Sequence, residues 1–378
     1  MKRTFFGIAV AVPFLLALST SCSDPIFSSI REEVELEDAD VSGAIYSIVR
    51  FGNDLYTQNG KIYRKLGENM AFSHNWETFS VPPVSSDYPY VNKLAADETY
   101  LYAQITKINE DDEEGENVAV GSEVWCWDGE EWWPLVLPGD EGGEGETLSA
   151  SSFGVNSATL FCTNAVQPEH RKAYLNHAGT IYCLSGSSAE VVLTGESDNT
   201  TEPTASSRNC AYFDGQVYFT SEAAMTTNET SGSDATRMYR VYGGDAIYFM
   251  DSDGEWTKWT DIGYSIFTLS VTNGDTGESG MNAVIAGTAS GIWILVINKE
   301  TGSCEGDYTS SFKNASSTLS SYYRIHASLV ANPSQPLDES AIYASADYSG
   351  SSSNTSASTK NRGLWSYLGE TRKSWNRE

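Results

Sequence analysis

The feature that most constrains the fold of this chain is a loosely repeated pattern of short, alternating apolar segments. The segments are rich in Tyr, Val, Ile, Phe and Trp, and Gly, Asn, Asp and Ser separate each one from the next. Alternation with a period of two residues is typical of β-strands, and few stretches show the period of an amphipathic helix. The pattern therefore predicts an all-β protein.

The pattern recurs in six units of roughly 40 to 57 residues, each able to supply four short strands. The units span 44–82, 90–139, 151–195, 207–263, 266–311 and 322–378. A sheet with two apolar faces cannot bury both alone, whereas a ring of sheets buries each face on a neighbour. We expect a β-propeller of six or seven four-stranded blades over residues 44–378. A seventh blade would come from a poorly marked unit or from a split of the long fourth unit, and paired β-sandwiches are the alternative.

One of these units resembles a blade of the kelch family. Its stretch "VYGGDAIYFMDSDGEW" contains Gly243 and Gly244, then Tyr248, then Trp256, in that family's order. The glycine pair is missing from the other units. The kelch likeness is therefore loose and confined to one repeat.

The N-terminus has the pattern of a secretion signal. Lys2 and Arg3 precede the apolar run Phe5–Leu18. This run is shorter than the roughly 20 residues that span a bilayer, but it is typical of the core of a signal peptide. It closes on small residues before a lone cysteine, Cys22.

That ending resembles a bacterial lipobox in the relaxed form of spirochaetal lipoproteins. Leu18 stands one place earlier than usual, and Ser19 occupies the usual Leu position. The resemblance implies cleavage before Cys22, acylation of Cys22 with palmitate or similar chains, and an anchor in the membrane of the bacterial cell envelope, at the outer membrane or the periplasmic face. The alternative is an ordinary secretory signal with an incidental Cys22.

The expected domains are a signal peptide at 1–21, a lipidated cysteine with an acidic tether at 22–43, and the propeller at 44–378. The stretch "EEVELEDADV", from Glu32 to Val41, favours a solvated tether because of its dense carboxylates. It could instead add a strand or close the ring.

The charge balance limits the possible partners. The chain has 51 acidic and 23 basic side chains and a net charge of −28. This charge repels nucleic acid and anionic head groups, so we expect no nucleic-acid partner. We expect a protein or glycan partner and a monomer.

Metal and cofactor motifs are missing from the sequence. The four histidines form no HxH or HExxH pair, and there is no CxxC, G-x-S-x-G or P-loop motif. The acidic loop 110–116 lacks the EF-hand spacing. We therefore expect no metal, no cofactor and no identifiable catalytic residue. The pairing of Cys162 with Cys183 is left open.

Five polar insertions are expected between the second and third strands of their units. Loops at equivalent positions would emerge on one face of a propeller, and loops on a rigid scaffold commonly carry function. This face is the predicted binding face. The insertions are 109–121, 166–172, 223–235, 273–280 and 349–360.

The stretch "WCWDGEEWW", from Trp125 to Trp133, is interpreted as a β-hairpin rather than a ligand site. Asp128-Gly129 would form a tight type I′ turn. By alternation, Trp125 and Trp127 share one face and Cys126 takes the other. Trp132 and Trp133 then point to opposite faces, which makes them weak candidates for a binding contact.

These observations favour a lipid-anchored, non-enzymatic binding or scaffold protein outside the cytoplasm, with an unknown partner. The alternative is a carbohydrate-active or other hydrolytic propeller. Two distant catalytic acids would leave no sequence motif, so the alternative stays open.

Overall fold

The chain divides into two compact units, residues 1–38 and 39–378. The computed structural model describes most of the second unit. The described residues are 39–43, 45–70, 72–110, 117–138, 146–147, 158–163, 171–177, 180–193, 209–213, 216–220, 225–229, 236–242, 245–250, 256–272, 281–298, 323–331, 341–348, 362–368 and 372–378.

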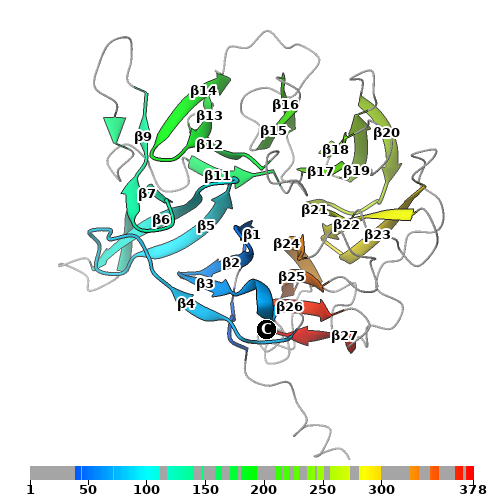
Figure 1. The fold of residues 1–378 in the computed structure, drawn as a ribbon, viewed down its shortest axis with the longest axis horizontal. Helices are drawn as coiled ribbons and strands as arrows, with labels where there is room; N and C mark the ends of the chain where they lie inside the picture. Colours follow the sequence, from blue (N-terminus) through cyan, green and yellow to red (C-terminus); the bar gives the residue numbers. More distant parts are fainter. Residues whose placement is uncertain are drawn as a thin grey trace, which may run out of the picture. The chain divides into compact units, whose positions relative to one another are not determined.

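The first part of the unit forms three sheets (Figure 1). The first has the order β1 (Ile48–Phe51), β2 (Asp54–Asn59), β3 (Lys61–Lys65) and β4 (Glu77–Phe79), with the short 3-10 helix η2 (Gly67–Asn69) before β4. The second has the order β5 (Tyr90–Ala96), β6 (Leu101–Glu110), β7 (Asn117–Trp127) and β8 (Trp132–Pro134). The third contains β9 (Val136–Leu137), β10 (Glu146–Thr147), β11 (Ala158–Cys162), β12 (Ala173–His177), β13 (Thr180–Ser185) and β14 (Ser188–Leu193) in the order β10-β9-β14-β13-β12-β11.

Four further sheets follow in chain order. The fourth pairs β15 (Asn209–Phe213) with β16 (Gln216–Thr220), and the fifth has the order β17 (Met225–Glu229), β18 (Thr236–Tyr242), β19 (Ala246–Met250) and β20 (Trp256–Asp261). The sixth contains β21 (Ile266–Thr272), β22 (Met281–Thr288) and β23 (Gly291–Asn298). The seventh contains β24 (Tyr323–Val330), β25 (Ala341–Tyr348), β26 (Gly363–Leu368) and β27 (Arg372–Arg377).

This architecture confirms the all-β prediction. Neighbouring strands of the described sheets pair antiparallel, except that β14 and β9 pair parallel. The predicted fourth unit, 207–263, contains two separate sheets, β15-β16 and β17-β20. The fourth unit is therefore split into two sheets. A split of this unit was one of the two expected origins of a seventh blade.

The apolar side chains form five buried clusters, and each cluster is shared by two sheets. One joins the first sheet to the second, and another joins the second to the third. Two more join the fifth to the sixth and the sixth to the seventh. The last joins the seventh sheet to the first. Inner strands such as β26 are buried along their whole length, because a neighbouring sheet covers each face.

Residues from the two ends of the unit lie against each other. Val41 is fully buried, and its N–H donates to the carbonyl oxygen of Glu378 at 3.2 Å. Leu364 N–H donates to the Val41 carbonyl at 3.4 Å, and Ser42 forms a β-bridge with Gly363. The end of the stretch expected to be a tether therefore packs on the seventh sheet.

A buried charged group lies where the first and seventh sheets meet. We call Lys65, Trp76, Ser366 and Glu378 the Lys65 cluster. Lys65 Nζ lies 2.6 Å from a Glu378 carboxylate oxygen, and both side chains are fully buried. Trp76 Nε1 donates to the same carboxylate at 2.7 Å, and Ser366 Oγ donates to its other oxygen.

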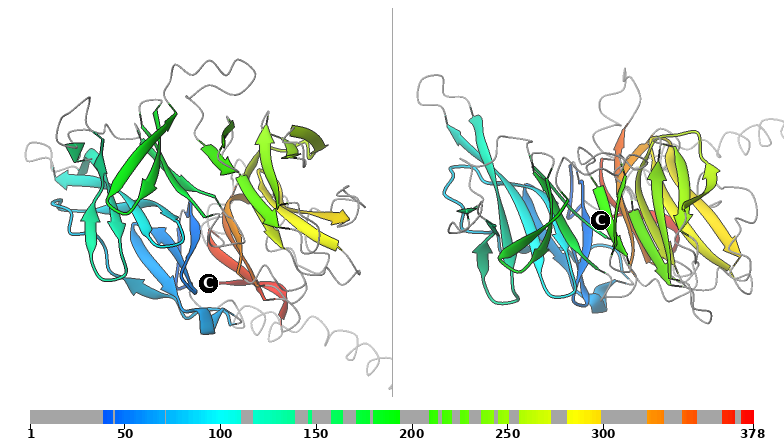
Figure 2. Two further views of the ribbon diagram at one scale, coloured as in Figure 1. Left: turned by 45° about the horizontal axis from the view of Figure 1, so that its top comes forward. Right: turned by 90° about the horizontal axis from the view of Figure 1, so that it is seen from above.

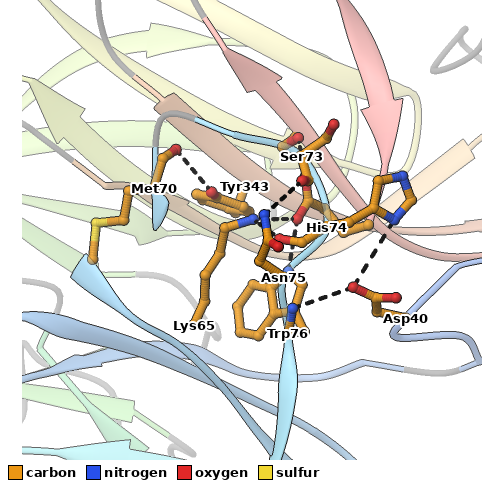
Figure 3. Close-up of polar contacts among 10 residues, drawn as sticks. Asp40, Lys65, Met70, Ser73, His74, Asn75, Trp76 and Tyr343 are labelled. Atoms are coloured by element: carbon orange, nitrogen blue, oxygen red, sulfur yellow. Dashed lines mark hydrogen bonds and ion pairs between the residues drawn. The ribbon is translucent and has the colours of Figure 1, made fainter. Parts of the chain in front are cut away.

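The surroundings of Lys65 complete this arrangement (Figure 3). Its ammonium group also donates to the His74 carbonyl at 2.5 Å and lies 5.4 Å from the Trp76 ring centre and 5.2 Å from that of Tyr343. Asp40 accepts a hydrogen bond from Trp76 N–H at 3.2 Å. The cluster thereby joins the start of the described unit to its last residue.

The predicted insertions do not lie at one end of their sheets. Insertions 109–121 and 349–360 join second to third strands, as expected, and the long β6-β7 hairpin runs into the first of them (Figure 2). Insertions 166–172 and 273–280 instead join first to second strands, and 223–235 contains β17 itself. Successive connections of an antiparallel sheet lie at opposite ends. The prediction of one shared binding face was therefore wrong.

Within the described part of the chain, no helix is both long enough and apolar enough to cross a membrane.

Candidate ligand-binding cavity

A cavity of about 320 Å³ lies between five strands from five sheets, each the first strand of its predicted unit. Its lining comes from β1 and the residues just before it, and from β5, β11, β21 and β24. Figure 1 shows these strands next to one another, although they come from distant parts of the sequence. The lining is mixed, with aromatic, apolar and hydroxyl-bearing residues, and one lysine, one histidine and one cysteine.

The hydroxyl groups of the lining hold neighbouring first strands together. Leu94 N–H donates to Ser47 Oγ at 2.8 Å, which links β5 to the start of β1. Ser328 N–H donates to Thr268 Oγ1 at 3.3 Å, which links β24 to β21. These bonds satisfy buried polar groups and keep the wall of the cavity rigid.

His326 contacts two aromatic rings of the lining. Its ring centre lies 5.5 Å from that of Tyr46 and 5.2 Å from that of Phe267. Its Nε2 lies 3.9 Å from the Asp347 carboxylate, which is in turn paired with Arg362 at 3.2 Å.

This environment disfavours the charged form of His326. Burial lowers the pKa of the imidazole, and the charges of Arg324 and Arg362 act in the same direction, against the Asp347 carboxylate. At neutral pH the ring is therefore uncharged, so it presents one donor and one acceptor nitrogen.

Basic side chains gather around the cavity. Lys93 is part of the lining, and Arg50 follows Val49, another lining residue. Arg50 donates to the Val330 carbonyl at 3.1 Å. Burial and the nearby charge of Arg171 lower the pKa of Arg50 to about 10. Two like charges are thus held close together beside the cavity.

Cys162 contributes a protonated thiol to the lining. Burial raises its thiol pKa, although the charges of Lys93 and Arg171 act in the opposite direction. The thiolate is the nucleophilic form of cysteine, so this group is chemically quiet near neutral pH.

Cys162 and Cys183 do not form a disulfide. Both are free, as is Cys126. Cys162 lies on β11 and Cys183 on β13, with β12 between them. Two strand spacings amount to roughly 10 Å, whereas a disulfide needs Cα atoms within about 7 Å.

The predicted hairpin at Trp125–Trp133 exists, but its turn differs from the prediction. Trp127 pairs with Trp132, so the loop contains four residues rather than a two-residue type I′ turn. Asp128 closes this loop, because its Oδ1 accepts from the N–H groups of Glu130 and Glu131, both at 2.9 Å. These bonds hold the pKa of Asp128 below its usual value.

The two tryptophans proposed as contacts lie apart from the cavity lining. Trp132 packs against the cluster between the first and second sheets, and its Nε1 donates to Ser80 Oγ at 3.1 Å. Trp133 is 45% exposed, and its Nε1 donates to Asp128 Oδ2 at 3.0 Å. The two rings thus take opposite faces, as alternation predicted. Their role in binding stays a prediction, as does lipidation of Cys22, which lies outside the described residues.

Sequence reasoning missed the cavity residues, including Lys93 and His326. Each lies on the first strand of a unit, and that shared position is the signal that could have drawn attention to them. Among the described residues, no group of three or more His, Cys, Asp or Glu side chains could hold a metal ion.

The sequence comparisons identify the class of protein. A family model described as the TP013X lipoprotein family matches residues 3–238, which is more than half of the chain. The chain therefore belongs to the TP013X lipoprotein family.

Two relatives come from Treponema pallidum (strain Nichols), and both are named uncharacterized lipoprotein. One is 32% identical over 90 residues, which is 23% of this chain and 18% of the relative. The other is 29% identical over 89 residues, which is 24% of this chain and 22% of the relative. The matches thus span about a fifth of each relative's length.

Solved structures of low similarity include a luciferin-regenerating enzyme, with a TM-score of 0.41, 10% identity and coverage of 91% of this chain and 95% of that one. Another is a PQQ-bound aldose sugar dehydrogenase from Streptomyces coelicolor, with a TM-score of 0.43, 9% identity and coverage of 88% and 96%. We draw no inference about this chain from likenesses this weak.

Proposed function

We propose that this chain is a lipid-anchored binding protein of the bacterial cell envelope that takes a small ligand in the cavity between the first strands. The observation that carries the proposal is the cavity itself, about 320 Å³ in volume and lined by five separate sheets. Small-molecule sites are typically clefts of this size, mostly apolar with a few polar groups. Such a site suits binding without chemistry.

The proposed architecture is a seven-bladed β-propeller in which each described sheet belongs to one blade. Apolar clusters shared by successive sheets, and by the seventh and first, support this arrangement. The first strands of propeller blades line a central channel, so the cavity would be part of that channel. The signal peptide at 1–21 and the tether from Cys22 onward complete the proposal.

The hydrolytic alternative finds no support in this cavity. Glycoside hydrolysis needs two carboxyl groups about 5 to 9.5 Å apart. The described lining of the cavity includes no Asp or Glu. Its one thiol is protonated near neutral pH, because burial raises the pKa of Cys162. We therefore favour a binding role.

The anchor is tested by cell fractionation of the Cys22→Ala variant in the source bacterium or a lipoprotein-processing host. We expect the variant to leave the membrane fraction, because acylation at Cys22 supplies the apolar chains. Cys183→Ala is the matched control and should stay with the membrane. Retention of Cys22→Ala in the membrane would show that lipidation of this residue is not the anchor.

The cavity is tested by a thermal-shift screen of the full chain in a non-ionic detergent, using small anionic, neutral and cationic compounds. At a concentration of about 100 times Kd, a ligand should stabilise the native state by about 2.7 kcal/mol. His326→Trp should fill the cavity and remove the shift. Tyr264→Trp, at an exposed position, is the control and should keep it. No shift with any compound, or an unchanged shift in His326→Trp, would overturn the proposal.

A further inference from the structure

Most charged side chains around the cavity are basic, although the chain as a whole is acidic. The chain carries a net charge of −28, yet the described lining contains Lys93 and no carboxylate. Arg50 and Arg171 lie near the lining, from β1 and from the residues before β12, and the charge of Asp97 also reaches Cys162. The Asp347 carboxylate beside His326 is paired with Arg362. Basic side chains thus outnumber carboxylates around this cavity of an acidic protein.

Short-range charge decides what such a cavity binds. Surface charges more than about 8 to 10 Å away are largely screened at physiological ionic strength, whereas buried charges are screened much less. The carboxylates of the outer surface therefore contribute little at the cavity. A cation in the wall favours a negatively charged ligand and disfavours a cationic one.

The aromatic side chains of the lining also favour an organic ligand. Tyr46, Phe161 and Phe267 present rings to the lining, and Tyr46 is 48% exposed. Aromatic faces favour planar or apolar groups and gain little from a bare inorganic ion. A volume of about 320 Å³ falls at the lower end of the range for small-molecule sites, so the space suits a small organic ligand.

We propose that the cavity selects small organic carboxylates, with Lys93 holding the carboxylate and Tyr46 packing against the body of the ligand. This inference rests on the proposed function and names its ligand class. His326, which contacts both Tyr46 and Phe267, would supply a neutral hydrogen-bonding group beside the bound anion. The positive charge at neutral pH then comes from Lys93, with Arg50 and Arg171 adding to the local field.

The experiment uses two probes of the same shape, indole-3-acetate and the neutral indole-3-acetamide, with inorganic phosphate as a third. Binding to the full chain in non-ionic detergent is measured by isothermal titration calorimetry. We expect the acid to bind at least ten times more tightly than the amide, and phosphate to bind more weakly than the acid.

Matched variants separate the contribution of the Lys93 charge to binding from that of the Tyr46 ring. Lys93→Met should reduce the acid-to-amide ratio to about one, and Lys93→Arg should restore most of it, because Arg keeps the charge. Tyr46→Ala should weaken the binding of the acid and of the amide by the same factor. Lys61→Met and Tyr88→Ala change exposed residues of the same types and should alter neither affinity.

The outcomes distinguish this inference from the proposed function. Equal binding of acid and amide, or a ratio unchanged in Lys93→Met, would overturn anion selection and leave the cavity as a binding site. Anion selection is also overturned if the screen yields only neutral or cationic ligands and His326→Trp abolishes their binding. Tighter binding of phosphate than of the acid would overturn the organic class. No binding of any compound would overturn both proposals.

Discussion

At the scale of single residues, we expect substitution in the buried Lys65–Glu378 pair to lower the free energy of unfolding strongly. Burial raises the pKa of the Glu378 carboxyl and lowers that of the Lys65 ammonium, because water no longer stabilises either charge. Trp76 and Ser366 donate to the same carboxylate and offset part of this cost. The pair is therefore tolerated only while each member retains its partners.

Removing one member of the pair should be far more harmful than replacing both. We expect Lys65→Met to lower the free energy of unfolding by about 3–5 kcal/mol, because it leaves a buried carboxylate without its cation. In Lys65→Met/Glu378→Leu, the loss should fall short of the summed single losses by about 2 kcal/mol or more. Guanidinium unfolding followed by Trp fluorescence measures these values.

The control for this cycle is Lys258→Met, which breaks an exposed pair with Asp261 at 2.7 Å. Both side chains of that pair are about half exposed, so no measurable change is expected. Simple additivity of the Lys65 and Glu378 substitutions would show that the two groups are not coupled.

Single residues also mark where sequence reasoning stops. Alternation placed Trp125 and Trp127 on one face and Cys126 on the other, and the buried clusters confirm it. The turn that follows was predicted wrongly. A two-residue turn and a four-residue loop closed by the Asp128 side chain can both contain Asp-Gly, and the local sequence does not decide between them.

At the scale of elements, the sheets require close approach where one packs against the next. A Cβ atom added to Gly287 of β22 would lie 2.5 Å from Thr268 Cγ2 on β21 and 3.0 Å from the Ile325 carbonyl oxygen on β24. The backbone oxygen cannot move aside without disturbing β24. Gly287 is thus required by the packing of the sixth sheet on the seventh.

We expect Gly287→Ala to lower the free energy of unfolding by about 1–3 kcal/mol, as overpacking of a core does. Gly263→Asn is the matched control, because open space surrounds Gly263 and Asn accepts its φ of +77°. Urea unfolding of both variants measures the difference. Wild-type stability in Gly287→Ala would show that the two sheets are not packed this tightly in solution.

The elements themselves were largely predictable, because strand formation follows local alternation. The ranges of the first, fifth and sixth units correspond to one sheet each, and the fourth unit corresponds to two. The second unit contains β5 to β8, but its last strand, β9, joins the third sheet. The connections were less predictable. Polar insertions look alike in sequence whether they follow a first or a second strand, so their common face could not be inferred without the strand count of each unit.

At the scale of the whole molecule, the net charge of −28 acts against the folded state, because folding brings like charges together. Salt screens this repulsion, and the Debye length falls from about 30 Å at 0.01 M to about 8 Å at 0.15 M. The stability of the folded chain at neutral pH should therefore increase with salt.

We expect the thermal midpoint at pH 7 to rise as NaCl increases from about 0.01 to 0.15 M. Differential scanning calorimetry measures it. The same series near pH 4.4, where the net charge vanishes, is the control and should show a much smaller rise. A midpoint at pH 7 that stays constant or falls with salt would show that attractive pairs outweigh the net repulsion.

The sequence by itself determined that this chain is built from short antiparallel strands, because alternation and turn residues act over a few positions. It also pointed to lipoprotein membership, which the family match established. Only the tertiary structure brought Lys93 to the same cavity as His326, and Lys65 to Glu378. Such contacts between residues distant in sequence depend on strand register and on sheet packing. A shift of one residue in register moves a side chain to the opposite face of its sheet. No local pattern carries that information.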